Sequence, residues 1–94
     1  MSGLAEKVRS ELAKLKDPVS NVPLLFVDAE IDVQESSSGD IYIVYIPKNP
    51  YSPHIITNAE AVKSIASKIA GQRRVVVEVR NHVMADFLNM KLNG

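Results

Sequence analysis

Two runs of β-branched residues separated by one amphipathic helix constrain the fold of this chain more than any other feature. Residues 41–46 are an unbroken apolar run and residues 74–80 contain four valines, and both patterns are typical of strands. Between them, apolar residues keep helical spacing over residues 55–69, and Gly71 follows where a left-handed helix terminus is favoured. A helical crossover joins parallel strands of one sheet, so we expect these two strands to run parallel.

One helix and one strand are predicted before these elements. Apolar residues at steps of four, four and three predict a helix over residues 2–16, and Asp17-Pro18 ends it because proline disfavours helical geometry in the preceding residue. Strict alternation over residues 27–33 predicts a half-buried strand. The polar turn at residues 35–40 then joins this strand to the run 41–46 as a hairpin.

The resulting order of helix, strand, strand, helix, strand, helix predicts a single α+β domain over residues 1–94. A last helix is expected over residues 82–92, with Asn81 as its cap. We expect a small two-layer sandwich in which helices cover mainly one face of a three-stranded mixed sheet. The other face combines acidic and apolar residues, so the last helix or a second copy of the chain should cover part of it.

The start of the second helix is left open by the sequence. Residues 47–53 hold three of the five prolines and predict a stiff, irregular loop before it. In one alternative Ser52 caps the helix and Pro53 takes the first helical position. In the other, Thr57 is the cap and Glu60 completes a capping box.

Composition excludes several classes of function. Eleven Lys and Arg residues balance eleven Asp and Glu residues, which argues against broad electrostatic binding of nucleic acid. The chain has no cysteine, so disulfides, thiolate zinc sites, cysteine-ligated clusters and cysteine nucleophiles are excluded. No apolar run approaches the ~20 residues that a membrane-spanning helix needs, and the charged first helix is unlike a signal peptide. We therefore expect a cytoplasmic protein that does not contact membranes.

The loop before the second helix resembles a motif of a known family. Its sequence is Asn49-Pro50-Tyr51-Ser52-Pro53, and the iron–sulfur cluster assembly domain family, which includes the PaaD-like and SufT-like proteins, has approximately Thr-Pro-Gly-Cys-Pro there. Asp17-Pro18 and the order of elements resemble the same family over most of the chain. Two positions differ, since Ser52 replaces the family cysteine and Val19 stands where glutamate is usual.

The resemblance implies a role in the maturation of metal–sulfur clusters. A thiolate at a helix amino terminus is stabilised by exposed amides and the helix dipole, but a serine hydroxyl is far less acidic and is a poor ligand for iron. We interpret Ser52 as a helix cap or loop hydroxyl, and expect a non-enzymatic adaptor that binds no cofactor of its own. Its partner would be an assembly factor or an apoprotein client. Two versions remain open. Either the chain keeps the family's docking surface without its cluster chemistry, or it shares only the fold and has a different function.

Self-association is a further expectation. A domain of this length buries only about 60–65% of its unfolded surface, so a leftover apolar face should meet a partner. A homodimer is one way to cover such a face.

The other candidate residues give weaker signals. His82 and Asp86 are four apart on the predicted last helix and, with His54, could supply nitrogen and oxygen ligands to a metal. We favour the simpler interpretation of a histidine at a helix start paired with a surface carboxylate. The first strand carries three acids that we interpret as a solvated outer face rather than a cation site. These acids are Asp28, Glu30 and Asp32.

A nucleic-acid or ribosome-associated module is the alternative function. Small α+β sandwiches resemble the KH-type RNA-binding fold, but this chain lacks the Gly-x-x-Gly loop that clamps the RNA backbone. The alternative needs a basic cluster, which forms only if the loop at Lys48 and Tyr51 converges with the loop at Arg73 and Arg74. Nucleic acid is therefore the less favoured partner.

Overall fold

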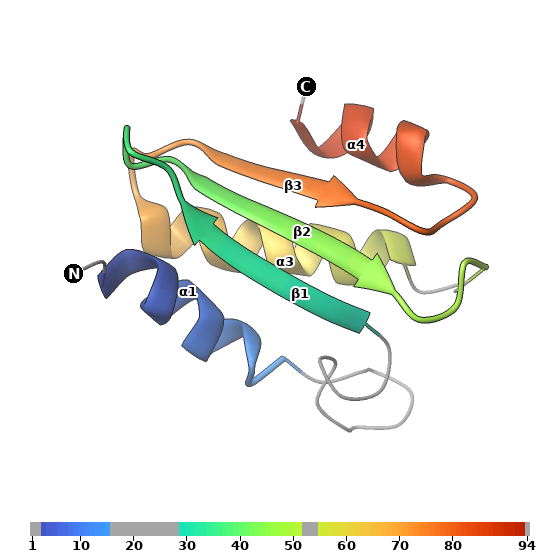
Figure 1. Ribbon diagram of the computed structural model, residues 1–94, viewed down its shortest axis with the longest axis horizontal. Helices are drawn as coiled ribbons and strands as arrows, with labels where there is room; N and C mark the ends of the chain where they lie inside the picture. The colour runs from blue at the N-terminus through green and yellow to red at the C-terminus, as the bar shows by residue number, and fades with distance from the viewer. Residues whose placement is uncertain (1–2, 16–28, 52–54, 94) are drawn as a thin grey trace.

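The computed structural model describes residues 3–15, 29–51 and 55–93 and confirms the predicted α+β class (Figure 1). The elements follow one another in the predicted order of helix, strand, strand, helix, strand, helix. They are α1 (Gly3–Leu12), β1 (Ala29–Glu35), β2 (Ile41–Pro47), α3 (Ile55–Ala70), β3 (Val75–Val79) and α4 (Ala85–Asn93).

The strands form one sheet in the order β1-β2-β3. β1 and β2 are the predicted antiparallel hairpin, in which Val33 pairs with Ile43. β2 and β3 run parallel, with Ile43 beside Val77, as the helical crossover predicts. β2 is the central strand, with Ile41, Ile43 and Tyr45 buried on one face and Val44 and Ile46 half-buried on the other.

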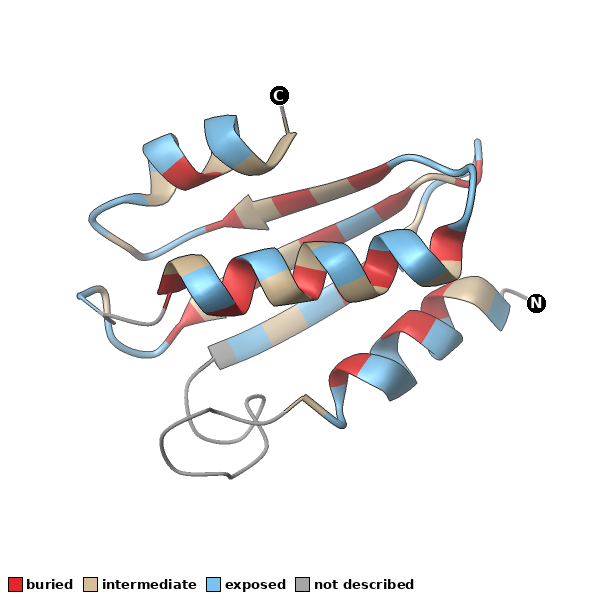
Figure 2. Ribbon diagram, turned by 180° about the vertical axis from the view of Figure 1, so that it is seen from behind, coloured by how far each residue is buried: buried red, intermediate tan, exposed pale blue. Residues whose placement is uncertain are grey.

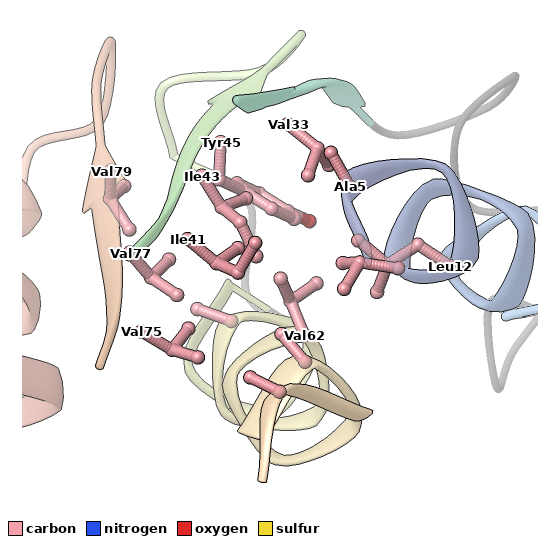
Figure 3. Packing of buried hydrophobic residues seen from close by; sticks show 14 of the residues in the cluster. Ala5, Leu12, Val33, Ile41, Ile43, Tyr45, Val62, Val75, Val77 and Val79 are labelled. Atoms are coloured by element: carbon pink, nitrogen blue, oxygen red, sulfur yellow. The ribbon is translucent and has the colours of Figure 1, made fainter. Parts of the chain in front are cut away.

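The core lies between one face of this sheet and the helices α1 and α3 (Figure 3). Alternate residues of each strand point toward these helices, because side chains alternate between the two faces of a strand. Tyr45 of β2 and Val62 of α3 are both completely buried. The core also includes Ala5, Val8, Leu12, Val33, Ile41, Ile43, Ala59, Val77 and Leu88.

Several predicted boundaries are wrong at the helix ends. α1 ends at Leu12 and continues only as a turn, so its predicted end at residue 16 is too late. α3 begins at Ile55, which places Thr57 inside its first turn and rules out Thr57 as the cap. Ser52 and Pro53 lie outside the described residues. The terminating glycine is confirmed, because Gly71 has a φ of 66°.

The last helix begins at Ala85 and not at residue 82. Asn81 does not cap it. Instead, Asn81 takes a left-handed φ of 59°, which asparagine tolerates, and its Nδ2 donates a hydrogen bond of 3.1 Å to the carbonyl of Pro47. α4 lies along the outer edge of β3 and also contacts α3, so the described helices leave the second face of the sheet uncovered (Figure 1). We call this second face the open face.

Two asparagine side chains fasten α4 to β3. The Asn89 amide accepts a 2.6 Å hydrogen bond from the Val79 N–H and donates a 3.1 Å bond to the Val79 carbonyl. Asn93 makes the same pair of bonds to Val77, at 3.0 and 2.7 Å. Residues four apart on a helix are about 6 Å apart along its axis, and alternate strand residues are about 6.6 Å apart, so the spacings match. The two amides therefore take the place of a neighbouring strand.

Replacing Asn89 or Asn93 by alanine is expected to lower the free energy of unfolding by about 1–3 kcal/mol. Each substitution leaves a buried N–H and carbonyl of β3 without a partner. Chemical denaturation measures the loss, and hydrogen exchange should accelerate at the Val77 and Val79 amides. Met90→Ala, at an exposed position of the same helix, is the control and should change stability by less than about 0.5 kcal/mol. Equal stability of all three variants would contradict this account.

Candidate functional site

The family-like loop and the start of α4 meet at one end of the sheet. β2 and β3 are parallel, so the segments that follow them leave the sheet at the same end. Asn81 bonds to the Pro47 carbonyl, and the Val83 N–H donates a 3.0 Å bond to the Pro50 carbonyl. These two bonds join residues 47–51 to residues 80–84 as one unit.

Short local bonds shape both segments. Asn49 Oδ1 accepts a 2.9 Å hydrogen bond from the Tyr51 N–H. This bond forms an Asx-turn, in which an asparagine side chain bonds to the backbone two residues further on. On the other segment, His82 Nδ1 accepts a 3.0 Å bond from the Met84 N–H, and the His82 carbonyl accepts a 3.1 Å bond from the Ala85 N–H. The loop is thus held with its aromatic side chain pointing away from the core, because Tyr51 is 71% exposed.

Exposed apolar side chains gather at this end of the sheet and along α4. Pale blue positions recur along α4 in Figure 2, and within α4 only Leu88 is fully buried. Five of the six exposed large apolar side chains in the described residues belong to this region, and the sixth is Tyr42. We call the five the apolar surface: Tyr51 (71% exposed), Val83 (63%), Met84 (39%), Phe87 (50%) and Met90 (68%). Exposed apolar residues that cluster in this way are typical of protein contact sites.

A charged network lies on the open face. The Tyr42 hydroxyl and Arg80 Nε both donate to the carboxylate of Glu78, the latter at 2.6 Å. The Arg80 bond, and after it the Tyr42 bond, holds the pKa of Glu78 below its ordinary value. The bond to Glu78 in turn raises the pKa values of Tyr42 and Arg80. The three side chains therefore form one hydrogen-bonded network around the Glu78 carboxylate.

The acids of β1 lie on the same face. Glu30 and Asp32 are exposed, which agrees with the predicted solvated outer face, and Asp28 lies outside the described residues. The network around Glu78 was not predicted. Glu78 and Arg80 are two apart on β3, but only the sheet register brings Tyr42 beside them.

The structure does not assemble the candidate metal ligands on one helix face. His82 precedes α4, while Asp86 lies in its first turn, so the helical spacing on which the predicted pair depends is wrong. His54 lies outside the described residues. Within the described ranges, no group of three or more His, Cys, Asp or Glu residues is placed to hold a metal ion.

The basic cluster that the nucleic-acid alternative needs does not form. Lys48 and Tyr51 follow the carboxyl end of β2, whereas the Arg74 carbonyl accepts a 2.9 Å bond from the Ile41 N–H at the opposite end. A strand of seven residues spans about 20 Å, so the two loops cannot converge. The condition for that cluster is not met, because the parallel crossover returns the chain to the starting end of β2.

Comparisons of the chain with protein-family models, with curated proteins and with solved structures find no match. The family resemblance therefore stays a prediction from the sequence. Its loop residues Asn49, Pro50 and Tyr51 lie beside the segment that precedes α4, and Asp17, Pro18, Ser52 and Pro53 fall outside the described residues. No helix in the described part of the chain is long and apolar enough to cross a membrane.

Glu78→Gln is expected to reduce the pH dependence of stability. The pKa of Glu78 is lowered from 4.5 in the folded chain, so its contribution is complete above that pH and is lost as the pH falls through the folded value. The native chain should therefore unfold at a slightly higher temperature than the variant at neutral pH, and the difference should disappear in acid. The effect is small because the network is close to solvent. Thermal unfolding over a pH series checks this, and a difference that persists in acid would contradict it.

Proposed function

We propose that this chain is a non-enzymatic, cytoplasmic adaptor in iron–sulfur cluster assembly that binds an assembly factor or an apoprotein client. The observation that carries the proposal is the apolar surface, which adjoins the family-like loop through the Val83–Pro50 hydrogen bond. The loop sequence from Asn49 to Pro53 supports the cluster-assembly setting by its resemblance. Self-association is a second contact that we propose for the chain.

The chemistry of the apolar surface suits a protein partner. Two of its five side chains are methionines, which are flexible and adapt to the shape of a bound surface. Tyr51 and Phe87 are aromatic residues, a class enriched at protein interfaces. Among the described residues, no buried side-chain nitrogen or oxygen lacks a hydrogen-bond partner, so no unsatisfied buried polar group marks a small-molecule site.

The missing thiolate defines the proposed role. The chain has no cysteine, and the hydroxyl of Ser52 is a poor ligand for iron. An adaptor contributes to cluster assembly by bringing other proteins together and does not need a ligand of its own. The nucleic-acid alternative loses the basic cluster on which it depended, because Lys48 and Arg74 lie at opposite ends of the sheet.

Co-purification from the native host tests the docking role. The tagged native chain should recover cluster-assembly proteins or iron–sulfur apoproteins at both low and high salt, because apolar contacts are insensitive to screening. Phe87→Asp should abolish this recovery, since it places a charge on the apolar surface. Tyr42→Thr, which removes an exposed aromatic from the open face, is the control and should recover the same proteins as the native chain.

Two results of this experiment would contradict the proposal. One is recovery of RNA or ribosomal proteins that declines steeply with salt, which would favour the nucleic-acid alternative. The other is equal recovery of partners by the native chain and by Phe87→Asp.

Anaerobic reconstitution with iron and sulfide tests the absence of cluster chemistry. The native chain should stay colourless and bind no stoichiometric iron, because it has no thiolate. Ser52→Cys restores the residue of the family motif and should acquire labile iron, measured by absorbance and iron analysis. Ser64→Cys, at an exposed position of α3, controls for a thiol in the wrong place. A stoichiometric cluster on the native chain would contradict our account of Ser52.

A further inference from the structure

The two edges of the sheet are closed to different degrees. The outer edge of β3 is occupied by the Asn89 and Asn93 amides, and Lys63 Nζ donates a further 2.6 Å bond to the Val75 carbonyl. On the outer edge of β1, Arg9 Nη2 donates a 2.7 Å bond to the Val33 carbonyl.

The hydrogen-bond pattern of the hairpin shows which groups of β1 point outward. The Ser36 N–H donates to the Asp40 carbonyl. The backbone N–H and carbonyl groups of even-numbered β1 residues therefore bond to β2, and those of odd-numbered residues point away from β2. No described residue bonds to the N–H or carbonyl of Ile31, or to the N–H of Val33. An edge with such groups is a template for another strand.

We propose that two copies of this chain pair through β1, antiparallel and around a two-fold axis at Val33. The three strands of each copy then form one continuous sheet of six. In this pairing Val33 lies opposite Val33 of the second copy, and Ile31 lies opposite Glu35. The dimer does not depend on the cluster-assembly role.

Charge and strand length favour this register, since an axis at Gln34 would pair only residues 33–35 of β1. With the axis at Val33, Asp32 lies opposite the neutral Gln34 of the second copy, and Glu30 lies opposite Ser36. Moving the axis to Asp32 sets the two Asp32 carboxylates against each other, and moving it to Ile31 sets Glu30 against Asp32. Like charges directly opposite on neighbouring strands are destabilising. Gln34 Nε2 already donates a 2.8 Å bond to its own Asp32, so an amide is suited to face that carboxylate.

Arg9 leaves hydrogen-bonding capacity on the Val33 carbonyl. A carbonyl oxygen has two lone pairs, so the Val33 carbonyl can accept Arg9 and the N–H of the second copy together. Two other routes through the sheet itself are less favourable. The edge of β3 is already filled, and stacking two open faces would bring Glu30, Asp32 and Glu78 of both copies together.

Analytical ultracentrifugation of the full chain over a concentration series tests the dimer. The native chain should dimerise, Gln34→Lys should strengthen the dimer, and Gln34→Glu should weaken it. Each substitution acts at two symmetry-related sites opposite Asp32, so the two variants should differ by about tenfold or more in dissociation constant. Thermal unfolding confirms that both variants fold. A native chain that is monomeric at every concentration would overturn the proposal, as would equal constants for the two variants.

Cysteine cross-linking tests the register independently. The native chain has no cysteine, so any disulfide comes from the introduced thiols. In the proposed dimer, Asp32 and Gln34 of the two copies form a pair without hydrogen bonds, with Cα atoms about 4.5 Å apart, which a disulfide can bridge. A mixture of Asp32→Cys and Gln34→Cys chains should therefore cross-link on oxidation several-fold more than either variant alone. Cross-linking that is stronger within one variant than in the mixture would overturn the register.

Discussion

The hydrogen-bond demand of the sheet edges determines how this small domain is assembled. In a sheet of three strands only β2 is paired on both sides, so the outward N–H and carbonyl groups of the two outer strands need other partners. On β3 the partners are side-chain amides from α4, spaced to match alternate strand residues. The same bonds fix where α4 lies, and with it the segment that Asn81 and Val83 attach to the family-like loop.

Polar anchoring of α4 has a consequence for its apolar residues. A short helix usually attaches to a domain by burying an apolar stripe. Within α4 only Leu88 is fully buried, and the Asn89 and Asn93 amides attach the helix to β3 by hydrogen bonds. Phe87 and Met90 are therefore not needed for the core and remain exposed. The apolar surface thus follows from how the β3 edge is closed, and a partner can bind it without disturbing the fold.

Local patterns predicted the elements, while contacts between distant segments determined what the sequence could not reveal. The helical crossover between β2 and β3 could be predicted from local features alone. These are the helical period of residues 55–69, the apolar run 41–46 and the terminating Gly71. The predicted start of α4 was wrong because the Asn81 side chain bonds to the distant Pro47 carbonyl and does not cap the helix. For the candidate site, the sequence motif indicates Asn49, Pro50 and Tyr51. The contact of this loop with Val83 could not be predicted, because it depends on a tertiary hydrogen bond. Two asparagines four apart were the one sequence signal of the edge closure.

The order of strands relates the two proposed contacts to each other. β1 is at one side of the sheet, and β3 with α4 is at the other. In a dimer joined through β1, the two copies of β3 become the outer strands of the six, about 24 Å apart at the usual spacing of 4.8 Å between strands. Each apolar surface would then face outward at its own end, so the two proposed contacts would not compete. An adaptor dimerised in this way would be bivalent and would hold two proteins at once, which would raise its effective affinity for a partner that is itself dimeric.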